Sequence, residues 1–332
     1  MSHNHDPYGR GAMRPLQIPL KGWWQVVQRV WAESSRDNLS VIAAGCAFYA
    51  LFAIFPTLSA LICFYGLTAD PATVELQLGM LALVLPPQAY HMLVEQTHHI
   101  AAASSTTLGW SFLVSVGLAL WSVTALTQAI FSALNIAYEE QERRSLLRFY
   151  LSAFIFTVAG IFGGVVTLLV VVYLPIAFAY AGYATDFERF ISWARWPLLA
   201  LMAFFLLTCL YRYGPSRRSA QWRWVTAGSL FATLMWLLVS AGFSYYVSGF
   251  ANYDKIYGSL GAVIVLLFWL YLSVYVFLLG AEINAELELQ TAQDTTEGKP
   301  KPMGERGAFV ADHVAGGHQG NIRPVAPWRK PP

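Results

Sequence analysis

The chain has 332 residues, of which 56% are hydrophobic, 15% are aromatic and 12% are charged, and its formal net charge is +2. Soluble globular domains carry about 25% charged residues, so this composition excludes an ordinary water-soluble globule and indicates a membrane protein. The small net charge gives no reason to expect a nucleic-acid partner. The three cysteines lie in apolar blocks and have the spacing of neither a disulfide framework nor a zinc site.

Residues 1–36 form a polar N-terminal segment that lacks the apolar core of a cleavable signal peptide. Its second half places five apolar side chains along one side of a helix: Trp23, Val26, Val27, Val30 and Trp31. Basic residues lie near the other side of that helix. This pattern predicts an amphipathic helix that lies on the cytoplasmic surface of a membrane.

Six stretches without a charged residue follow this segment: Asn38–Ala69, Gln96–Tyr138, Phe149–Thr185, Trp196–Tyr211, Trp224–Tyr253 and Ile256–Ala281. A membrane-spanning helix needs about 20 apolar residues, and five of the stretches exceed that length. The fourth has only 16 residues, but Arg195 and Arg212 at its ends have side chains long enough to reach opposite interfaces. We therefore predict an all-α membrane protein with a bundle of six transmembrane helices in residues 37–290.

Two further segments are predicted to lie outside the six spans. Residues 70–103 contain no Lys or Arg, and their apolar stretch Leu76–Leu85 is too short to cross a bilayer and ends at two prolines. An outer helical hairpin fits this pattern. Residues 291–332 are rich in Gly, Pro and polar residues, and they are predicted to be a disordered cytoplasmic tail.

The basic residues predict the orientation of the chain. With six spans, 18 of the 21 Lys and Arg residues fall on the side of the two termini, and only Arg189, Arg195 and Lys255 fall on the other side. Cytoplasmic loops carry the excess of positive charge. Both termini are therefore expected in the cytoplasm of a cell that holds the chain in its inner (plasma) membrane.

No pattern of residues predicts catalysis. His91, His98 and His99 would share a helical face, so a metal is conceivable, but no carboxylate cluster or cysteine accompanies them, and a solvated loop is the preferred interpretation. The sequence also lacks the nucleophile and phosphate-binding motifs GxSxG, SxxK and the P-loop. We expect no metal, no cofactor and no enzymatic activity.

Polar residues at helix ends are more informative. In the six-span topology five of them fall near the cytoplasmic interface: Asp37, Asn135, Arg212, Glu282 and Asn284. One hypothesis is a single polar cluster in which Arg212 pairs with a carboxylate, serving as a substrate site or as a structural latch. The alternative is ordinary anchoring of helix ends at the interface.

A second group of residues lies at the predicted outer turn between the fifth and sixth spans: Tyr246, Asn252, Tyr253 and Tyr257. An aromatic belt beside a polar turn is the simple interpretation. The functional interpretation is an outer gate for whatever enters the bundle.

Several motifs resemble the YihY/BrkB family of bacterial inner-membrane proteins, a family once mislabelled as ribonuclease BN. The resemblance covers about residues 20–288, and the matching residues are Asp37, Ala43–Pro56, Trp121, Asn135, Tyr211, Arg212, Pro215, Trp222, Gly228, Trp236, Tyr246, Tyr257–Gly261, Trp269–Tyr271 and Gly280–Ala285. Cys46 departs from the family pattern, in which leucine is more usual, but it is also apolar.

The resemblance implies a six-helix inner-membrane protein and little about activity. The ribonuclease label finds no support in the sequence, which has no metal-ligand cluster, paired carboxylates or basic groove. A transporter-like role in handling a lipid or an envelope precursor fits better. The alternative is a non-catalytic scaffold that supports the envelope, and a membrane-embedded hydrolase ranks last. Membrane lipids are the expected partners, and a homo-oligomer is left open.

Overall fold

The computed structural model describes residues 6–68, 105–169, 185–249 and 259–315, and this part of the chain is built from helices. In chain order the α-helices are α1 (Leu20–Arg36), α2 (Leu39–Thr68), α5 (Ser105–Ala137), α6 (Leu146–Leu168), α8 (Thr185–Tyr213), α9 (Trp222–Gly249), α11 (Ser259–Leu289) and α12 (Phe309–Asp312). Within those ranges the only β pairing is an isolated bridge between Ala220 and Thr296. The predicted all-α class is confirmed.

Five of the helices contain a stretch long and apolar enough to cross a membrane: Leu39–Leu61, Gly109–Ala137, Leu146–Thr167, Trp222–Val247 and Gly261–Leu289. The apolar part of α8, Pro197–Tyr213, is shorter. The N-terminal part of α8 holds charged residues such as Asp186 and Arg195, which limit the apolar length. The structure thus supports five spans, and the predicted sixth would depend on this shorter stretch. The predicted hairpin of residues 70–103 lies outside the described residues.

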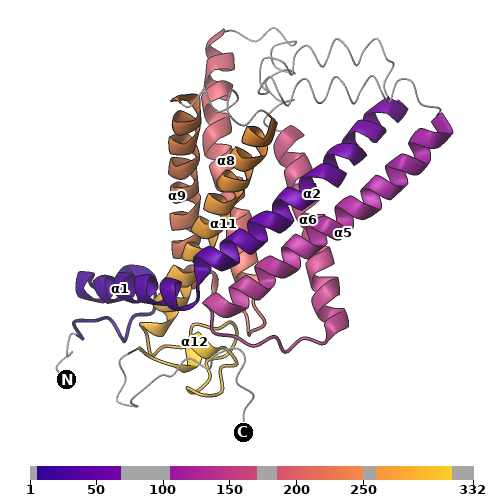
Figure 1. The fold of residues 1–332 in the computed structure, drawn as a ribbon. Coiled ribbons are helices and arrows are strands. Elements are labelled where there is room, and N and C mark those ends of the chain that lie inside the picture. Colours follow the sequence, from indigo (N-terminus) through magenta and orange to yellow (C-terminus); the bar gives the residue numbers. More distant parts are fainter. Residues whose placement is uncertain (1–5, 69–104, 170–184, 250–258, 316–332) are drawn as a thin grey trace.

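Helix α11 is the centre of the bundle and contacts α1, α2, α5, α9 and α12. Figure 1 shows α2 and α5 running together at a slant, away from α8, α9 and α11, and the two helices contact each other along much of their length. Helices α1 and α12 lie at one end of the bundle, which we call the α1 end. The slanted pair meets α11 near this end, where Leu39 and Ala43 of α2 pack against Leu278.

The backbones of α9 and α11 approach most closely where two glycines meet. A Cβ atom built on Gly228 would lie 2.0 Å from the carbonyl oxygen of Gly280, and one built on Gly280 would lie 2.8 Å from the carbonyl oxygen of Gly228. Small residues permit this kind of approach between membrane helices. Ala232 and Ala281 are buried in the same core.

Helix α1 crosses the end of the bundle at a steep angle to the other helices (Figure 1). Val26 is buried against Trp224 and Leu287, and Trp23 and Val30 pack on the same core. A separate set of α1 side chains is exposed, namely Leu20, Trp24, Val27 and Trp31. These residues are spaced by four, three and four, so they share one face. The apolar side predicted from the sequence is therefore divided between the protein core and an exposed stripe.

The segment that follows α11 is ordered as far as residue 315, contrary to the predicted disorder of the whole tail. Thr291, Thr295 and Val310 are buried. Arg306 donates hydrogen bonds to the carbonyl oxygens of Ala292, Gln293, Lys301 and Ala311. One buried guanidinium thus satisfies several backbone acceptors, which compensates for the low apolar content of the segment. Residues 316–332 lie outside the described part of the chain.

Candidate functional site

Five carboxylates interact electrostatically at the α1 end and are here called the acidic cluster: Glu33, Asp37, Glu139, Glu282 and Glu286. They come from α1, the joint between α1 and α2, the loop after α5, and α11. Glu282 and Glu286 are four residues apart on α11 and therefore share a helical face. The tertiary fold brings the other three carboxylates to that face.

Two arginines compensate part of this negative charge. Arg29 forms an ion pair with Glu286 and donates to Gln290 Oε1 at 2.8 Å. Arg36 forms an ion pair with Glu33 at 2.6 Å. Within the described residues neither Asp37 nor Glu139 nor Glu282 has an ion pair. The acidic cluster therefore has an excess of carboxylates over paired cations.

The two half-buried members of the cluster outside the helical spans titrate near neutral pH. Burial raises the pKa of Asp37 to about 6, and the neighbouring Glu33 contributes in the same direction. Burial raises the pKa of Glu139 to about 7, and repulsion from Glu33, Asp37 and Glu286 adds to that effect. Both groups can therefore gain and lose protons under physiological conditions.

Glu282 is the most secluded member of the cluster. Only 2% of its surface is exposed. Its Oε2 atom is buried and has no hydrogen-bond partner among the described residues. A buried polar atom without a partner is uncommon in folded proteins because it loses its hydration without compensation.

Asn135 lies elsewhere at the α1 end and joins two loops. Its Nδ2 atom donates to Glu142 Oε2 at 2.9 Å, and its Oδ1 atom accepts a hydrogen bond from the backbone N–H of Ser216 at 2.7 Å. Glu142 also accepts from Arg144 at 2.8 Å. Asn135 thus connects the loop after α5 to the loop after α8.

Arg212 does not pair with Glu282, as the cluster hypothesis had required. Its Nη2 atom donates to Glu297 Oε2 at 2.6 Å, its Nη1 atom donates to the carbonyl oxygen of Ala220, and its guanidinium lies 4.5 Å from the ring centroid of Trp222. Glu297 belongs to the tail that was predicted to be disordered. The expectation was wrong because the tail, and not α11, supplies the counter-ion.

Asn284 faces α9. Its Oδ1 atom accepts from the N–H of Gly228 at 2.7 Å, and its Nδ2 atom donates to the carbonyl oxygen of Val225 at 3.1 Å. Residues two apart on a helix point in different directions, so Asn284 and Glu282 occupy different faces of α11. Of the five residues grouped from the sequence, the structure brings only Asp37 and Glu282 together.

Sequence reasoning missed an ion pair that is fully shielded from solvent. Arg217 donates to both carboxylate oxygens of Glu288, at 2.8 and 3.1 Å, and both side chains are 0% exposed. Thr295 donates to the same carboxylate at 2.7 Å. The guanidinium of Arg217 lies 4.1 Å from the ring centroid of Tyr138. Glu286 and Glu288 follow Glu282 after four and six residues, and this dense run of carboxylates was the signal in the sequence.

The predicted outer turn is described only in part. Tyr246 is exposed near the end of α9, whereas Asn252, Tyr253 and Tyr257 lie outside the described residues. The three loop histidines do so as well. Among the residues that the structure does describe, no group of three or more His, Cys, Asp or Glu side chains is arranged to hold a metal ion.

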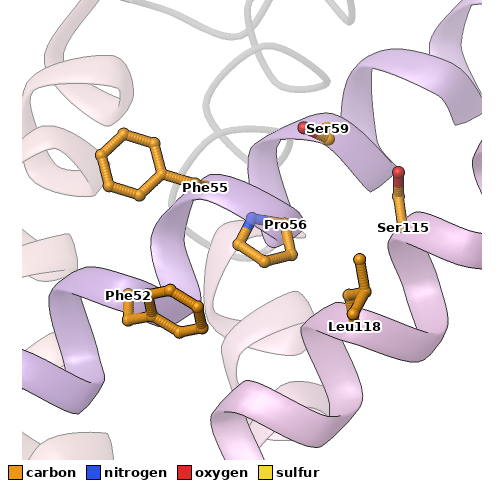
Figure 2. Close-up of a pocket in the computed structure, with 6 residues that line it drawn as sticks. All are labelled: Phe52, Phe55, Pro56, Ser59, Ser115 and Leu118. Carbon is orange, nitrogen blue, oxygen red and sulfur yellow. The ribbon is translucent and has the colours of Figure 1, made fainter.

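A groove of about 270 Å³ lies between α2 and α5, away from the acidic cluster. Figure 2 shows its lining, which is Phe52, Phe55, Pro56 and Ser59 from α2 and Ser115 and Leu118 from α5. Pro56 lacks an N–H group, so the carbonyl oxygen one turn earlier loses its helical partner and the helix is weakened at this point. The groove therefore combines an apolar wall with a few polar atoms.

Comparisons with known proteins agree on a membrane family. The family model described as Virulence factor BrkB matches residues 30–304. The ribonuclease-like protein YfkH of Bacillus subtilis is 36% identical over 256 residues, which are 74% of this chain and 88% of that protein. A UPF0761 membrane protein of Tolumonas auensis is 29% identical over 83% of this chain and 89% of its own length. No solved structure matches.

Proposed function

The chain belongs to the BrkB family of membrane proteins, and from this premise we propose that it is a transporter-like protein, and not an enzyme, that handles a lipid or another amphiphilic envelope precursor. The groove between α2 and α5 is the observation that carries this proposal. Binding sites for small molecules are mostly apolar and contain a few placed polar groups. The groove has this character, which suits an acyl chain.

The surroundings of the groove also support an amphiphilic substrate. Phe52, Phe55 and Leu118 are large apolar residues that remain substantially exposed in a helix pair apolar enough to cross a membrane. An acyl chain could therefore enter from the bilayer without passing through water. The hydroxyl groups of Ser59 and Ser115 would meet a polar part of the molecule near the chain.

We expect Ser115→Phe to fill the groove and to reduce lipid flux about tenfold, because the loss of two buried methylene contacts at roughly 0.8 kcal/mol each corresponds to about that factor in rate. The measurement is the transfer of a head-labelled fluorescent phospholipid between leaflets, in liposomes that contain the purified protein. The control is Ser132→Phe, which places the same ring at an exposed position of α5 outside the groove. Equal flux in the two variants would remove the groove from the transport path.

A non-catalytic scaffold is the second candidate, and one observation favours it. The α1 end is tied together by the ion pairs Arg212–Glu297 and Arg217–Glu288 and by the tail packed over them. Such a rigid end suits a protein that organises its neighbours. If the wild-type protein in liposomes moves no lipid under any gradient, the scaffold becomes the better assignment.

We propose that the α1 end faces the cytoplasm of a bacterial cell, as the distribution of Lys and Arg predicts. A reporter phosphatase that is active only outside the cytoplasm, fused before Asp6 or after Ala315, should therefore be inactive in both fusions. A fluorescent protein that folds only in the cytoplasm should be bright at both positions. Phosphatase activity at one end alone would instead indicate an odd number of spans, as would follow if α8 did not cross.

A further inference from the structure

Glu282 lies where α11 meets the joint between α1 and α2. It follows Leu278 by one helical turn, and Leu278 packs against Leu39 and Ala43 at the start of α2. Residues four apart lie on the same helical face. The Glu282 carboxyl is therefore directed at this joint, where it interacts with Asp37.

The charged and titratable groups around Glu282 come from every neighbouring element. Helix α1 contributes Glu33, Arg29 and Arg36, the joint contributes Asp37, the loop after α5 contributes Tyr138 and Glu139, and α11 itself contributes Glu286. Helices α2 and α5 contain no charged residue. Both arginines are already engaged, Arg29 by Glu286 and Arg36 by Glu33.

An ionised carboxylate at this position would be destabilised in two ways. It would lose its hydration without gaining a hydrogen bond at Oε2. It would also face carboxylates that the two arginines do not fully compensate. Since the described residues offer no arrangement for a metal ion, the smallest ligand that removes both costs is a proton.

We propose that Glu282 is a proton-binding site, that protons reach it from the α1 end by way of Glu139 and Asp37, and that its deprotonation loosens the contact of α11 with the joint between α1 and α2. The Oε2 atom that lacks a partner is the atom that receives the proton. The proton site is independent of the proposed function. Only its coupling to lipid movement depends on that function.

The two half-buried carboxyls of the acidic cluster, Asp37 and Glu139, are suited to the relay. The pKa values of Asp37 and Glu139, about 6 and about 7, lie near neutral pH, so both groups exchange protons readily there. Both side chains are only partly exposed and belong to the same acidic cluster as Glu282. A proton can therefore pass from solvent to Glu282 by way of Glu139 and Asp37, each of which takes up the proton and then releases it.

Release of the proton has a mechanical consequence at the joint. The new negative charge would lie beside the contact of Leu278 with Leu39, and it would be stabilised only if water or a cation entered. Since the folded state holds this proton, the stability that it contributes is present at low pH and is lost as the pH rises past the point at which Glu282 releases the proton. The packing between α11 and α2 should weaken above that pH.

Infrared spectroscopy of the full-length protein in lipid nanodiscs tests the proton site directly. At neutral pH we expect a carbonyl band of protonated carboxyls that shifts when glutamate is labelled with carbon-13 and that disappears at alkaline pH. In Glu282→Gln this band should lose the Glu282 component and keep that of Glu139, whose pKa is about 7. Glu305→Gln is the matched control, because Glu305 is exposed and its removal should leave the band unchanged. The wild-type titration needs no variant, so its outcome does not depend on whether Glu282→Gln folds. Absence of the band in the wild-type protein at neutral pH, or an undiminished band in a folded Glu282→Gln variant, would overturn the proposal.

A flux measurement then separates this proposal from the proposed function. We expect lipid flux to change with the pH on the α1 side, and we expect Glu282→Gln to lose this dependence while it retains thermal stability at neutral pH. If the Glu282 component of the infrared band is present but no lipid moves, the proton site stands and the transport function fails. If lipid moves but the Glu282 component is absent, transport stands and the proton site fails.

Discussion

Replacement of Gly228 by Ala should destabilise the folded protein by about 2–3 kcal/mol, the upper part of the range for overpacking a close-packed interior. The new Cβ atom would lie 2.0 Å from the carbonyl oxygen of Gly280 and 2.7 Å from the side chain of Asn284. Relief of these contacts requires α9 and α11 to separate. That movement would also break the hydrogen bond from the Gly228 N–H to Asn284. Thermal unfolding in detergent micelles measures the effect.

Gly242→Ala is the matched control on the same helix. A Cβ atom at Gly242 would meet nothing within 4 Å. Alanine favours the helix over glycine by roughly 1 kcal/mol, so this variant should be slightly more stable than the wild-type protein. Opposite signs for the two substitutions are the expected result. If both substitutions stabilise the protein, the close crossing of α9 and α11 is absent in solution.

Removal of one member of the pair Arg217–Glu288 should cost about 3–5 kcal/mol, because it leaves a buried charge without its partner. Both side chains are 0% exposed, and the pair is bidentate. Glu288→Ala would leave the Arg217 guanidinium buried on the ring of Tyr138. It would also remove the acceptor of the Thr295 hydroxyl, so the tail should become susceptible to proteolysis.

The double variant Arg217→Leu with Glu288→Leu provides the internal comparison. It removes both charges and keeps apolar volume, so it should be more stable than either single alanine variant. The surface control is Arg223→Ala, which removes an exposed arginine near the start of α9 and should change the stability by less than about 0.5 kcal/mol. If Glu288→Ala is as mild as Arg223→Ala, the pair does not hold the tail.

Features that depend on local pattern were predictable from the sequence. Charge-free stretches located α2, α5, α6, α9 and α11, because a charge inside a membrane span is costly wherever the neighbouring helices lie. The amphipathic pattern located α1, because the spacing of apolar side chains along a helix is also a local property of the sequence. The fourth span was harder to predict, because 16 residues between two arginines fit both a short crossing and a partly submerged helix.

The candidate site shows where local pattern was insufficient. The membrane depth of Asp37, Asn135, Arg212, Glu282 and Asn284 was inferred from topology, but depth does not specify which helical face meets which neighbour. Asn284 turned out to face α9, and Asn135 joins two loops. Arg212 found its partner, Glu297, in a segment whose composition suggested disorder. That segment is ordered by specific hydrogen bonds of Arg306, which composition does not reveal.

Composition and local pattern were enough to identify lipid as the environment of the chain, its helical class and the positions of most of its long helices. These follow from the free energy of transferring each residue into lipid, which depends mainly on the residue and its immediate neighbours in the chain. The partners of the buried charges, in contrast, are apparent only from the folded chain. Glu282 lacks a counter-ion because α1 supplies Arg29 to Glu286 and the tail supplies Glu297 to Arg212. The energy of a buried ion depends on groups within a few ångströms, and those groups come from parts of the chain that only folding brings together.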